Sequence, residues 1–328
     1  MNDLNEQQLQ EIIQTWFAAY NQSQNDRQTW LNAIDSTTRQ LWEPLMQPLI
    51  QHLKTRNIHQ ATLIPTGFLS LLPLHAAWTP DTTRPTDRHY ALDDIHFTYA
   101  PNAKSLIAAK AIAQTIQPNN ILAIDNPTQN LANSAREINA AIETFPDRTV
   151  LRHAEATVEN VRSKLSKASV VHFSCHGTAN LNDPLNSGLE MSNGLLTLRE
   201  ILALNLAEKS GIRLAILSAC ETGLQGIENA DEAISLPTGL LQAGVAGAIG
   251  SLWSVSEEST MLLLEKFYKL WRNEPLLSPD QALRQAQIWL RDASENEIAP
   301  LLGKRTNTPN NRPFSHPFHW SAFSYTGV

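Results

Sequence analysis

Two stretches of this chain, ASVVHFSCHG at residues 168–177 and IRLAILSACETG at residues 212–223, share one design. Each is a mainly apolar run that ends in reactive side chains and then a glycine. Runs of this length, bounded by turn residues, are typical of strands covered on both faces of a parallel sheet. A histidine at the end of one strand and a cysteine at the end of a later one can form a thiol–imidazole pair at a sheet edge.

The two runs lie within an alternation of strand-like and helix-like patterns. The other expected strands are 96–101, 120–125, 149–152, 245–253 and 320–326, and the expected helices are 104–116, 132–145, 157–166, 232–243, 259–272 and 279–291. This alternation predicts an α/β architecture with a mainly parallel central sheet. Functional groups in such sheets gather at the carboxyl ends of the strands.

The N-terminal part has a different pattern. Residues 1–38 are polar with a partial apolar face, and residues 41–53 repeat apolar side chains at helical spacing, so both are expected to be helical. Residues 61–69 are expected to form a hairpin that turns at Pro-Thr-Gly. The polar, proline-containing segments 80–88 and 306–313 are expected to be loops.

The composition excludes several classes of protein. Apolar residues make up 42% and charged residues 17% of the 328, which allows a sizeable core and argues against disorder. A net charge of −7 argues against a direct nucleic-acid surface. With only two cysteines, a disulfide-stapled secreted fold is not expected. We therefore expect a reduced, cytoplasmic protein.

Neither a signal peptide nor a membrane span is expected. The N-terminus lacks the basic and apolar regions of a signal peptide. The uncharged stretch 236–255 has the length of a membrane span, but it contains Pro237 and several glycines. A helix over 232–243, a cap at Gly244 and a buried strand over 245–253 account for it better.

Cys220 is the candidate nucleophile. It follows a strand-like run and precedes a Glu-Thr-Gly turn, so its side chain is expected to project from the sheet edge. A thiolate is a strong nucleophile, and a nearby imidazole can generate it by accepting the proton. Free cysteines are also common as small buried core residues, and spacing alone does not choose between the two interpretations.

Three histidines compete for the role of base, namely His153, His172 and His176. His172 lies inside an apolar run and is expected to be buried, whereas His176 precedes a glycine that frees the backbone for a sharp exit. Cys175 neighbours His176 and so points to the other sheet face, where we interpret it as a core residue. His172, Cys175, His176 and Cys220 could also be read as a set of zinc ligands. The His-x-x-Cys-His spacing lies on a strand and no Cys-x-x-Cys is present, so no metal site is expected.

Ordered blocks of this sequence resemble the CHAT family, caspase-like cysteine peptidases that are related to separases and are commonly fused to TPR repeats. HFSCHG at 172–177 resembles the family's histidine block, and SACETG at 218–223 resembles its cysteine block. The surrounding loops, helices and strands are similar over residues 63–65, 72–74, 184–189, 196–201, 240–245, 250–255, 282–287 and 316–323. The resemblance covers about residue 40 to the end of the chain.

The resemblance implies a caspase-like three-layer αβα sandwich over residues 39–328, preceded by an N-terminal helical segment over residues 1–38. It implies that Cys220 attacks the scissile carbonyl and that His176 activates the thiol or protonates the leaving amine. The N–H groups of Gly177 and Cys220 would hold the oxyanion.

The same resemblance places a specificity pocket along residues 250–255, with Trp253 and Ser254. Asp231, Glu232, Glu257 and Glu258 lie in the two segments near the expected cleft, where a carboxylate would select a basic residue before the cut. Solvated loop charge is the alternative interpretation of these residues. The family often has a Gly-Asp/Glu-Gly-like run where this chain has NADEA at 229–233, which leaves the pocket assignment open.

The predicted function is that of a thiol protease, an endopeptidase that cuts a dedicated protein target under regulation and needs no cofactor. A TPR-containing or other regulatory partner is expected on a separate segment or chain, since residues 1–38 show no TPR pattern. The alternative is a catalytically silent CHAT scaffold acting in protein–protein interaction. The presence of both His176 and Cys220 favours the enzyme, because a scaffold would be free to lose them.

Overall fold

The computed structural model describes residues 6–23, 25–180, 183–209, 211–219, 235–273, 277–305 and 307–328. The described residues form two compact units. The first contains the residues up to Ala61, Leu72–Phe97 and Gln287–Ser321. The second contains Thr62–Leu71, Thr98–Ala286 and Ala322–Val328. The boundary predicted between residues 38 and 39 stays a prediction.

The first unit is mainly helical, as expected for its N-terminal part. Its helices are α1 (Glu6–Asn21), α2 (Arg27–Gln40), α3 (Gln47–Lys54), α4 (Ala91–Asp94), α13 (Glu295–Leu301) and α14 (Pro317–Trp320), and α12 (Pro279–Asp292) begins in the second unit. Asp26 caps α2, because its side chain accepts a 3.0 Å hydrogen bond from the Thr29 N–H. Trp16 and Trp30 meet edge to face with ring centroids 4.7 Å apart, which joins α1 to α2.

The prediction of a hairpin over residues 61–69 is wrong. Only its first arm is a strand, β1 (Gln60–Leu63), and Gly67 begins the 3-10 turn Gly67–Leu71 instead. Pro65 has no N–H to donate to a ladder, which works against a second arm. The hairpin of this region lies further on, between β2 (Trp78–Pro80) and β3 (Arg88–Tyr90), and the predicted loop 80–88 is its connection.

The central sheet has eight strands in the order β1-β4-β13-β12-β11-β7-β5-β6. Their bounds are β4 (His96–Tyr99), β5 (Asn120–Asp125), β6 (Asp147–Arg152), β7 (Val170–Ser174), β11 (Leu214–Ser218), β12 (Gly247–Ser251) and β13 (Phe323–Gly327). Strands β6, β5, β7, β11 and β12 run parallel, and β13 pairs antiparallel with β12. The expected mainly parallel sheet is therefore confirmed.

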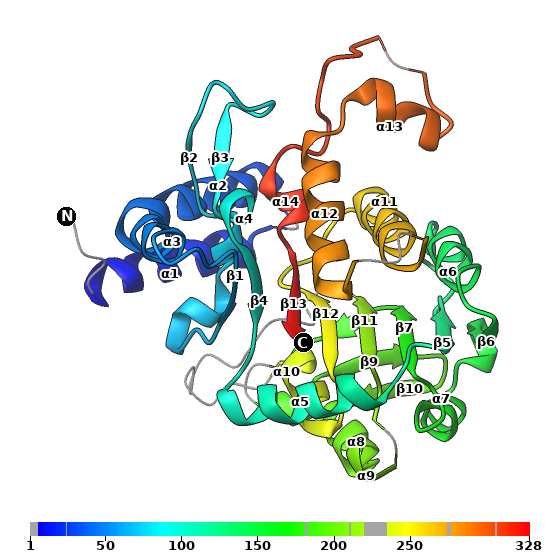
Figure 1. Cartoon of the computed structure of the whole chain (residues 1–328). Coiled ribbons are helices and arrows are strands. Elements are labelled where there is room, and N and C mark those ends of the chain that lie inside the picture. The colour runs from blue at the N-terminus through cyan, green and yellow to red at the C-terminus, as the bar shows by residue number, and fades with distance from the viewer. Residues whose placement is uncertain are drawn as a thin grey trace. The chain divides into compact units, whose positions relative to one another are not determined.

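Helices cover both faces of this sheet in the second unit (Figure 1). On one face lie α6 (Ser134–Ile142) and α11 (Glu257–Tyr268), and on the other lie α5 (Ala103–Thr115), α7 (Val158–Leu165), α8 (Leu198–Ala203) and α10 (Leu236–Ala243). Gly244 ends α10 as the sequence predicts, with φ of +110°. A Cβ at Gly244 would lie 2.3 Å from the Ala207 nitrogen, so the neighbouring short helix α9 (Leu206–Lys209) also requires a glycine here.

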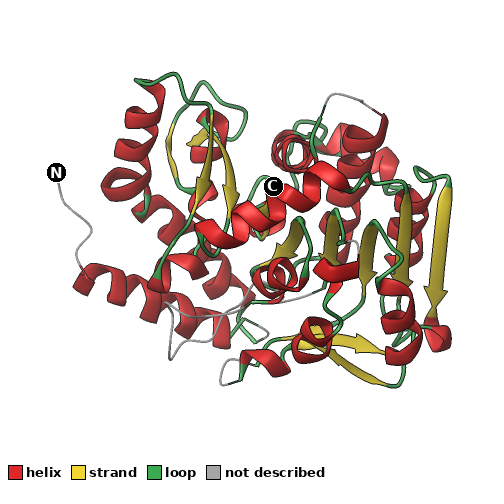
Figure 2. Ribbon diagram, turned by 60° about the horizontal axis from the view of Figure 1, so that its bottom comes forward, coloured by secondary structure: helices red, strands yellow, loops and turns green. Residues whose placement is uncertain are grey.

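A short second sheet follows β7 directly. It is formed by β8 (Gly177–Thr178), β9 (Gly188–Met191) and β10 (Gly194–Thr197), and Figure 2 shows it apart from the central strands. The strands expected from the sequence include none in this segment. The new sheet matters for the site because its first strand begins one residue after His176.

Side chains alternate between the two faces of β7. Val171, Phe173 and Cys175 pack into one apolar core with residues such as Leu122 and Leu217. His172 and Ser174 therefore point to the opposite face, toward α6 and α11. The two faces of β7 therefore differ, and only one of them packs entirely into an apolar core.

Candidate active site

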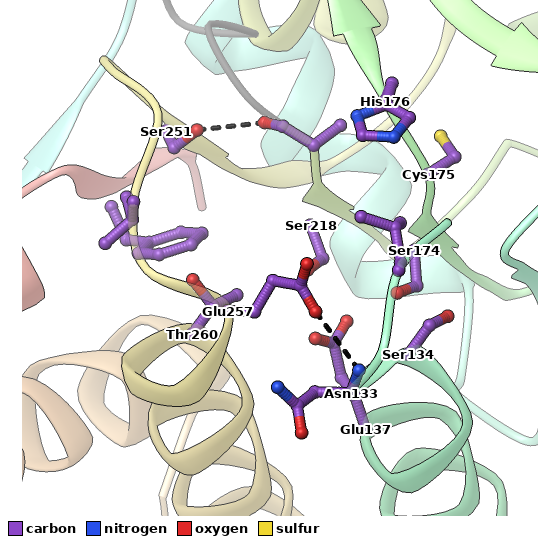
Figure 3. A pocket seen from close by; sticks show the side chains of 14 residues that line it. Asn133, Ser134, Glu137, Ser174, Cys175, His176, Ser218, Ser251, Glu257 and Thr260 are labelled. Carbon is purple, nitrogen blue, oxygen red and sulfur yellow. Dashed lines mark hydrogen bonds between the residues drawn. The ribbon is translucent and has the colours of Figure 1, made fainter. Parts of the chain in front are cut away.

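A cavity opens at the carboxyl ends of β7, β11 and β12 (Figure 3). It contains about 480 Å³ of space, part of which is open solvent. Its walls also include the N-terminal turns of α6 and α11, so the cavity lies where functional groups are expected in a parallel sheet. The lining residues are Leu131, Asn133, Ser134, Glu137, Ser174, Cys175, His176, Ser218, Ala219, Ser251, Val255, Glu257, Thr260 and Phe323.

His176 lies at the edge of this cavity, two residues beyond the last residue of β7. The side chain is half-buried, and its backbone carbonyl accepts a 2.9 Å hydrogen bond from the Glu190 N–H of β9. The Nε2 atom lies 2.8 Å from Oδ1 of Asn130, in the loop after β5. Half-burial with one ring nitrogen bound is an arrangement suited to proton transfer, because the ring is held but not enclosed.

The end of β11 forms another part of the cavity wall. Ser218 pairs with Ser174 of β7, and Ala219 is held by a 2.9 Å hydrogen bond from the Ser251 hydroxyl to its carbonyl (Figure 3). Cys220 is the next residue in the sequence and lies outside the described residues. The predicted His176–Cys220 pair therefore stays a prediction.

Cys175 is a core residue, as the alternation along the strand predicts. Its side chain is only 2% exposed and belongs to the same apolar cluster as Phe173. A thiol buried among apolar side chains keeps its proton and reacts slowly. The predicted burial of Cys175 is confirmed, and its exclusion as the nucleophile stays a prediction.

His172 is completely buried and both of its ring nitrogens are bound. Nδ1 lies 2.8 Å from the Tyr268 hydroxyl, and Nε2 lies 2.7 Å from Oε1 of Glu137. Burial and the nearby Glu137 carboxylate raise the pKa of Tyr268 well above its usual value, so its hydroxyl keeps the proton. Tyr268 can thus donate to Nδ1 while Nε2–H donates to Glu137. This saturated network is structural.

Two carboxylates line the cavity from different helices. Glu137 of α6 is 4% exposed, and Glu257 of α11 is exposed and accepts a 3.1 Å hydrogen bond from the Asn133 N–H. Among the described lining residues, none is a lysine or an arginine. The described part of the cavity therefore favours a cationic group over an anionic one.

The other predicted site residues are placed as follows. Gly177 begins β8 and is half-buried. Trp253 is fully buried and does not line the cavity, and Ser254 is exposed outside it, whereas the next residue, Val255, is a lining residue. A substrate contact at Trp253 would have to come from its backbone. Asp231 lies outside the described residues.

Asn130 and Glu137 are site residues that the sequence did not reveal. The Asn-Pro turn after β5 is visible in the sequence, but the contact from Asn130 to His176 joins residues 46 positions apart. Glu137 sits in an ordinary helical pattern, and its burial depends on His172 from a separate strand. Neither contact leaves a local signal.

The part of the chain that the structure describes lacks two further features. No group of three or more His, Cys, Asp or Glu side chains is arranged to hold a metal ion there. Among the described helices, none is both long and apolar enough to cross a membrane.

Comparisons with known proteins concern the family and the fold of this chain. The CHAT domain family model matches residues 35–328. The Saccharomyces cerevisiae separase of a separase–securin complex aligns over 81% of this chain and 15% of its own, at 14% identity and a TM-score of 0.56. The Arg-specific cysteine proteinase gingipain R aligns over 98% of this chain and 74% of its own, at 9% identity and a TM-score of 0.54.

A chain of the Porphyromonas gingivalis RgpB complex of pro- and mature domains aligns over 98% of this chain and 76% of its own, at 9% identity and a TM-score of 0.53. A search of curated protein sequences gave no match. At these identities the structural likeness shows the fold alone, and the chain spans about 15% of the length of the separase. The expected caspase-like α/β sandwich is confirmed.

Proposed function

This chain belongs to the CHAT family, and from that premise we propose that it is a cysteine endopeptidase whose catalytic pair is His176 and Cys220. The observation that carries the proposal is the cavity shared by the carboxyl ends of β7 and β11. Ser174 and Ser218 are paired across these strands, and each is followed two residues later by one member of the pair. Equal offsets from a paired position support a common site.

The proposed reaction begins with proton transfer from the Cys220 thiol to the His176 imidazole. The thiolate attacks the scissile carbonyl carbon, and the resulting oxyanion is held by the N–H groups of Gly177 and Cys220. The imidazolium then gives its proton to the leaving amine as the C–N bond breaks. Water, deprotonated by the same imidazole, hydrolyses the thioester and restores the thiol.

The two cysteines provide the test of this proposal. We expect Cys220→Ala to abolish peptide cleavage and labelling by a thiol-reactive inhibitor, because the nucleophile is removed. Cys175→Ala should leave both largely intact, since that thiol is 2% exposed in the core. Cleavage of a peptide library and mass spectrometry of the labelled protein measure the two outcomes. Labelling at Cys175, or identical behaviour of wild type and Cys220→Ala with no peptide cut, would contradict the proposal and favour the scaffold.

The carboxylates of the cavity support a preference for a basic residue before the cut. Glu257 is the better candidate contact, because it is exposed, whereas Glu137 already accepts from His172. Asp231, Trp253 and Ser254 remain proposed substrate contacts. Gingipain R, which has a similar fold, is an Arg-specific proteinase.

Replacing Glu257 tests this preference. A charge-assisted hydrogen bond contributes about 1.5–3 kcal/mol, so we expect Glu257→Gln to lower kcat/KM for substrates with Arg or Lys before the cut by roughly 10- to 100-fold. Substrates with an uncharged residue there should change little. A uniform loss of kcat/KM over all substrates would show that Glu257 supports the fold. No loss of kcat/KM would show that other residues select the basic residue before the cut.

The partner we propose is a protein substrate, with a TPR-containing or other regulatory protein as a second partner. The separase of similar fold was solved with securin, a protein partner. A cytoplasmic location is likewise proposed from the cysteine content of the sequence.

A further inference from the structure

The loop after β5 is fixed by one side chain, that of Asn126. This residue is 8% exposed and has a φ of +46°, which asparagine tolerates better than most residues. Its Oδ1 accepts hydrogen bonds from the N–H groups of Asn130 and Leu131 at 3.0 and 3.2 Å, and its Nδ2 donates to the Leu131 carbonyl at 3.0 Å. The loop therefore has a defined shape.

The same asparagine ties the loop to the strand that carries the proposed base. The Asn126 N–H donates a 2.8 Å hydrogen bond to the carbonyl of Ser174, two residues before His176. Its own carbonyl lies 3.0 Å from Nδ1 of His153. Because this hydrogen bond joins the loop to the strand, the position of Asn130 relative to His176 is fixed.

Asn130 makes two contacts through the same atom. Its Oδ1 lies 2.8 Å from Nε2 of His176, and it accepts a 2.7 Å hydrogen bond from the Thr128 hydroxyl. An amide oxygen has two lone pairs and can accept both. In this orientation the Nε2 atom of His176 must carry a proton, which leaves the lone pair on Nδ1.

Resting on the proposed function, we propose that Asn130 is a positioning residue for His176. It accepts from Nε2–H, fixes the plane of the ring, and selects Nδ1 as the nitrogen that takes and returns the thiol proton. The loop shape set by Asn126 and the hydroxyl of Thr128 hold Asn130 in that orientation. A neutral amide gives this orientation without adding a charge beside the imidazole.

Other titratable groups of the described residues line the same cavity as His176. These are Glu137 from α6, Glu257 from α11 and Cys175, and Glu190 of β9 binds the His176 carbonyl through its N–H. These groups are unchanged in Asn130 variants, so any change in the tautomer of His176 between those variants reports on residue 130.

The first test does not depend on catalysis. Long-range ¹H–¹⁵N NMR of the ring nitrogens, with His176 assigned by comparison with His176→Gln, reads its tautomer in the Cys220→Ala protein. We expect the Nε2–H tautomer with Asn130, and a mixture of tautomers in Asn130→Ala. In Asn130→Asp the Nε2–H tautomer should persist, because a carboxylate oxygen accepts from the ring N–H as the amide oxygen does. An Nδ1–H tautomer with Asn130 in place would overturn the inference.

The second test uses the active protein. We expect Asn130→Ala to lower kcat roughly 10- to 100-fold with little change in KM, and Asn130→Asp to recover most of that loss. Gln129→Asn is the matched control, because it lies in the same exposed loop at φ of +61°, and should match wild type. Equal loss in Asn130→Asp and Asn130→Ala would mean that the amide donates to His176, which overturns the inference.

The two proposals fail in different ways. If no variant or wild type cuts any peptide while the NMR shows the Nε2–H tautomer and its dependence on Asn130, the proposed function fails and the positioning role stands. If cleavage depends on Cys220 but neither the tautomer nor kcat responds to Asn130, the inference fails alone.

Discussion

His172 and His176 are four residues apart on one strand and its extension, yet their surroundings are opposite. His172 is fully buried with both ring nitrogens bound, to Glu137 and Tyr268. His176 is half-buried at a cavity, and within the described residues only its Nε2 is bound, to Asn130. A ring with both nitrogens bound cannot exchange protons with a substrate, so His172 is structural, whereas the surroundings of His176 suit the base that we propose.

The largest effect expected from this comparison is on activity at His176. A general acid–base group contributes about 10²- to 10⁴-fold to a rate, so His176→Ala should lower kcat/KM by about 10³-fold. Its thermal midpoint should stay close to that of wild type, because the side chain is not part of the core. Peptide cleavage and calorimetry on the same preparation measure the two quantities. An active His176→Ala protein would contradict the proposed role of His176 as the acid–base group.

The next effect is on stability at His172. His172→Ala leaves the buried Glu137 carboxylate without its hydrogen-bond donor, and an unsatisfied buried acceptor costs about 1–3 kcal/mol. We expect urea unfolding to show a loss of that order, with activity per folded molecule largely kept. Replacing both partners, as in His172→Phe with Glu137→Leu, should restore much of the stability. A catalytic defect larger than the folding defect would show that this network also serves the reaction.

The smallest expected effect comes from buried histidines of the first unit. Burial lowers the pKa of His75 to about 4 from an ordinary value of 6.5. The unfolded chain thus binds more protons than the folded chain between these two values, so this contribution to stability is full above pH 6.5 and falls as the pH drops toward 4. Between pH 7 and 5.5 the loss should be about 1 kcal/mol.

Unfolding experiments over that pH range measure the effect of His75. His75→Gln removes the titrating group and should flatten the pH dependence relative to wild type. His319, whose pKa is lowered to about 4 mainly by burial, offers an independent second position. If the free energy of unfolding depends on pH in both variants as it does in wild type, other groups cause the acid sensitivity.

Much of the second unit could be predicted from local patterns. The apolar runs of β7 and β11, the Thr157 cap of α7 and the glycine that ends α10 are all consequences of short-range sequence. The hairpin expected after residue 60 failed, because a Pro-Thr-Gly turn is also compatible with a 3-10 turn. The strands β9 and β10 were missed because each spans only four residues, too short for a period-2 pattern to stand out.

The sequence by itself determined the class of fold, the family and the burial of Cys175 and His172, because these follow from strand periodicity and ordered motifs. The tertiary structure alone decided what each histidine contacts. Glu137 reaches His172 across 35 residues and Asn130 reaches His176 across 46, and such distant pairings leave no trace in a local pattern. The sequence gives the chemistry of each side chain. Which residues bury a histidine ring or bind its nitrogens is decided only when the strands and helices pack.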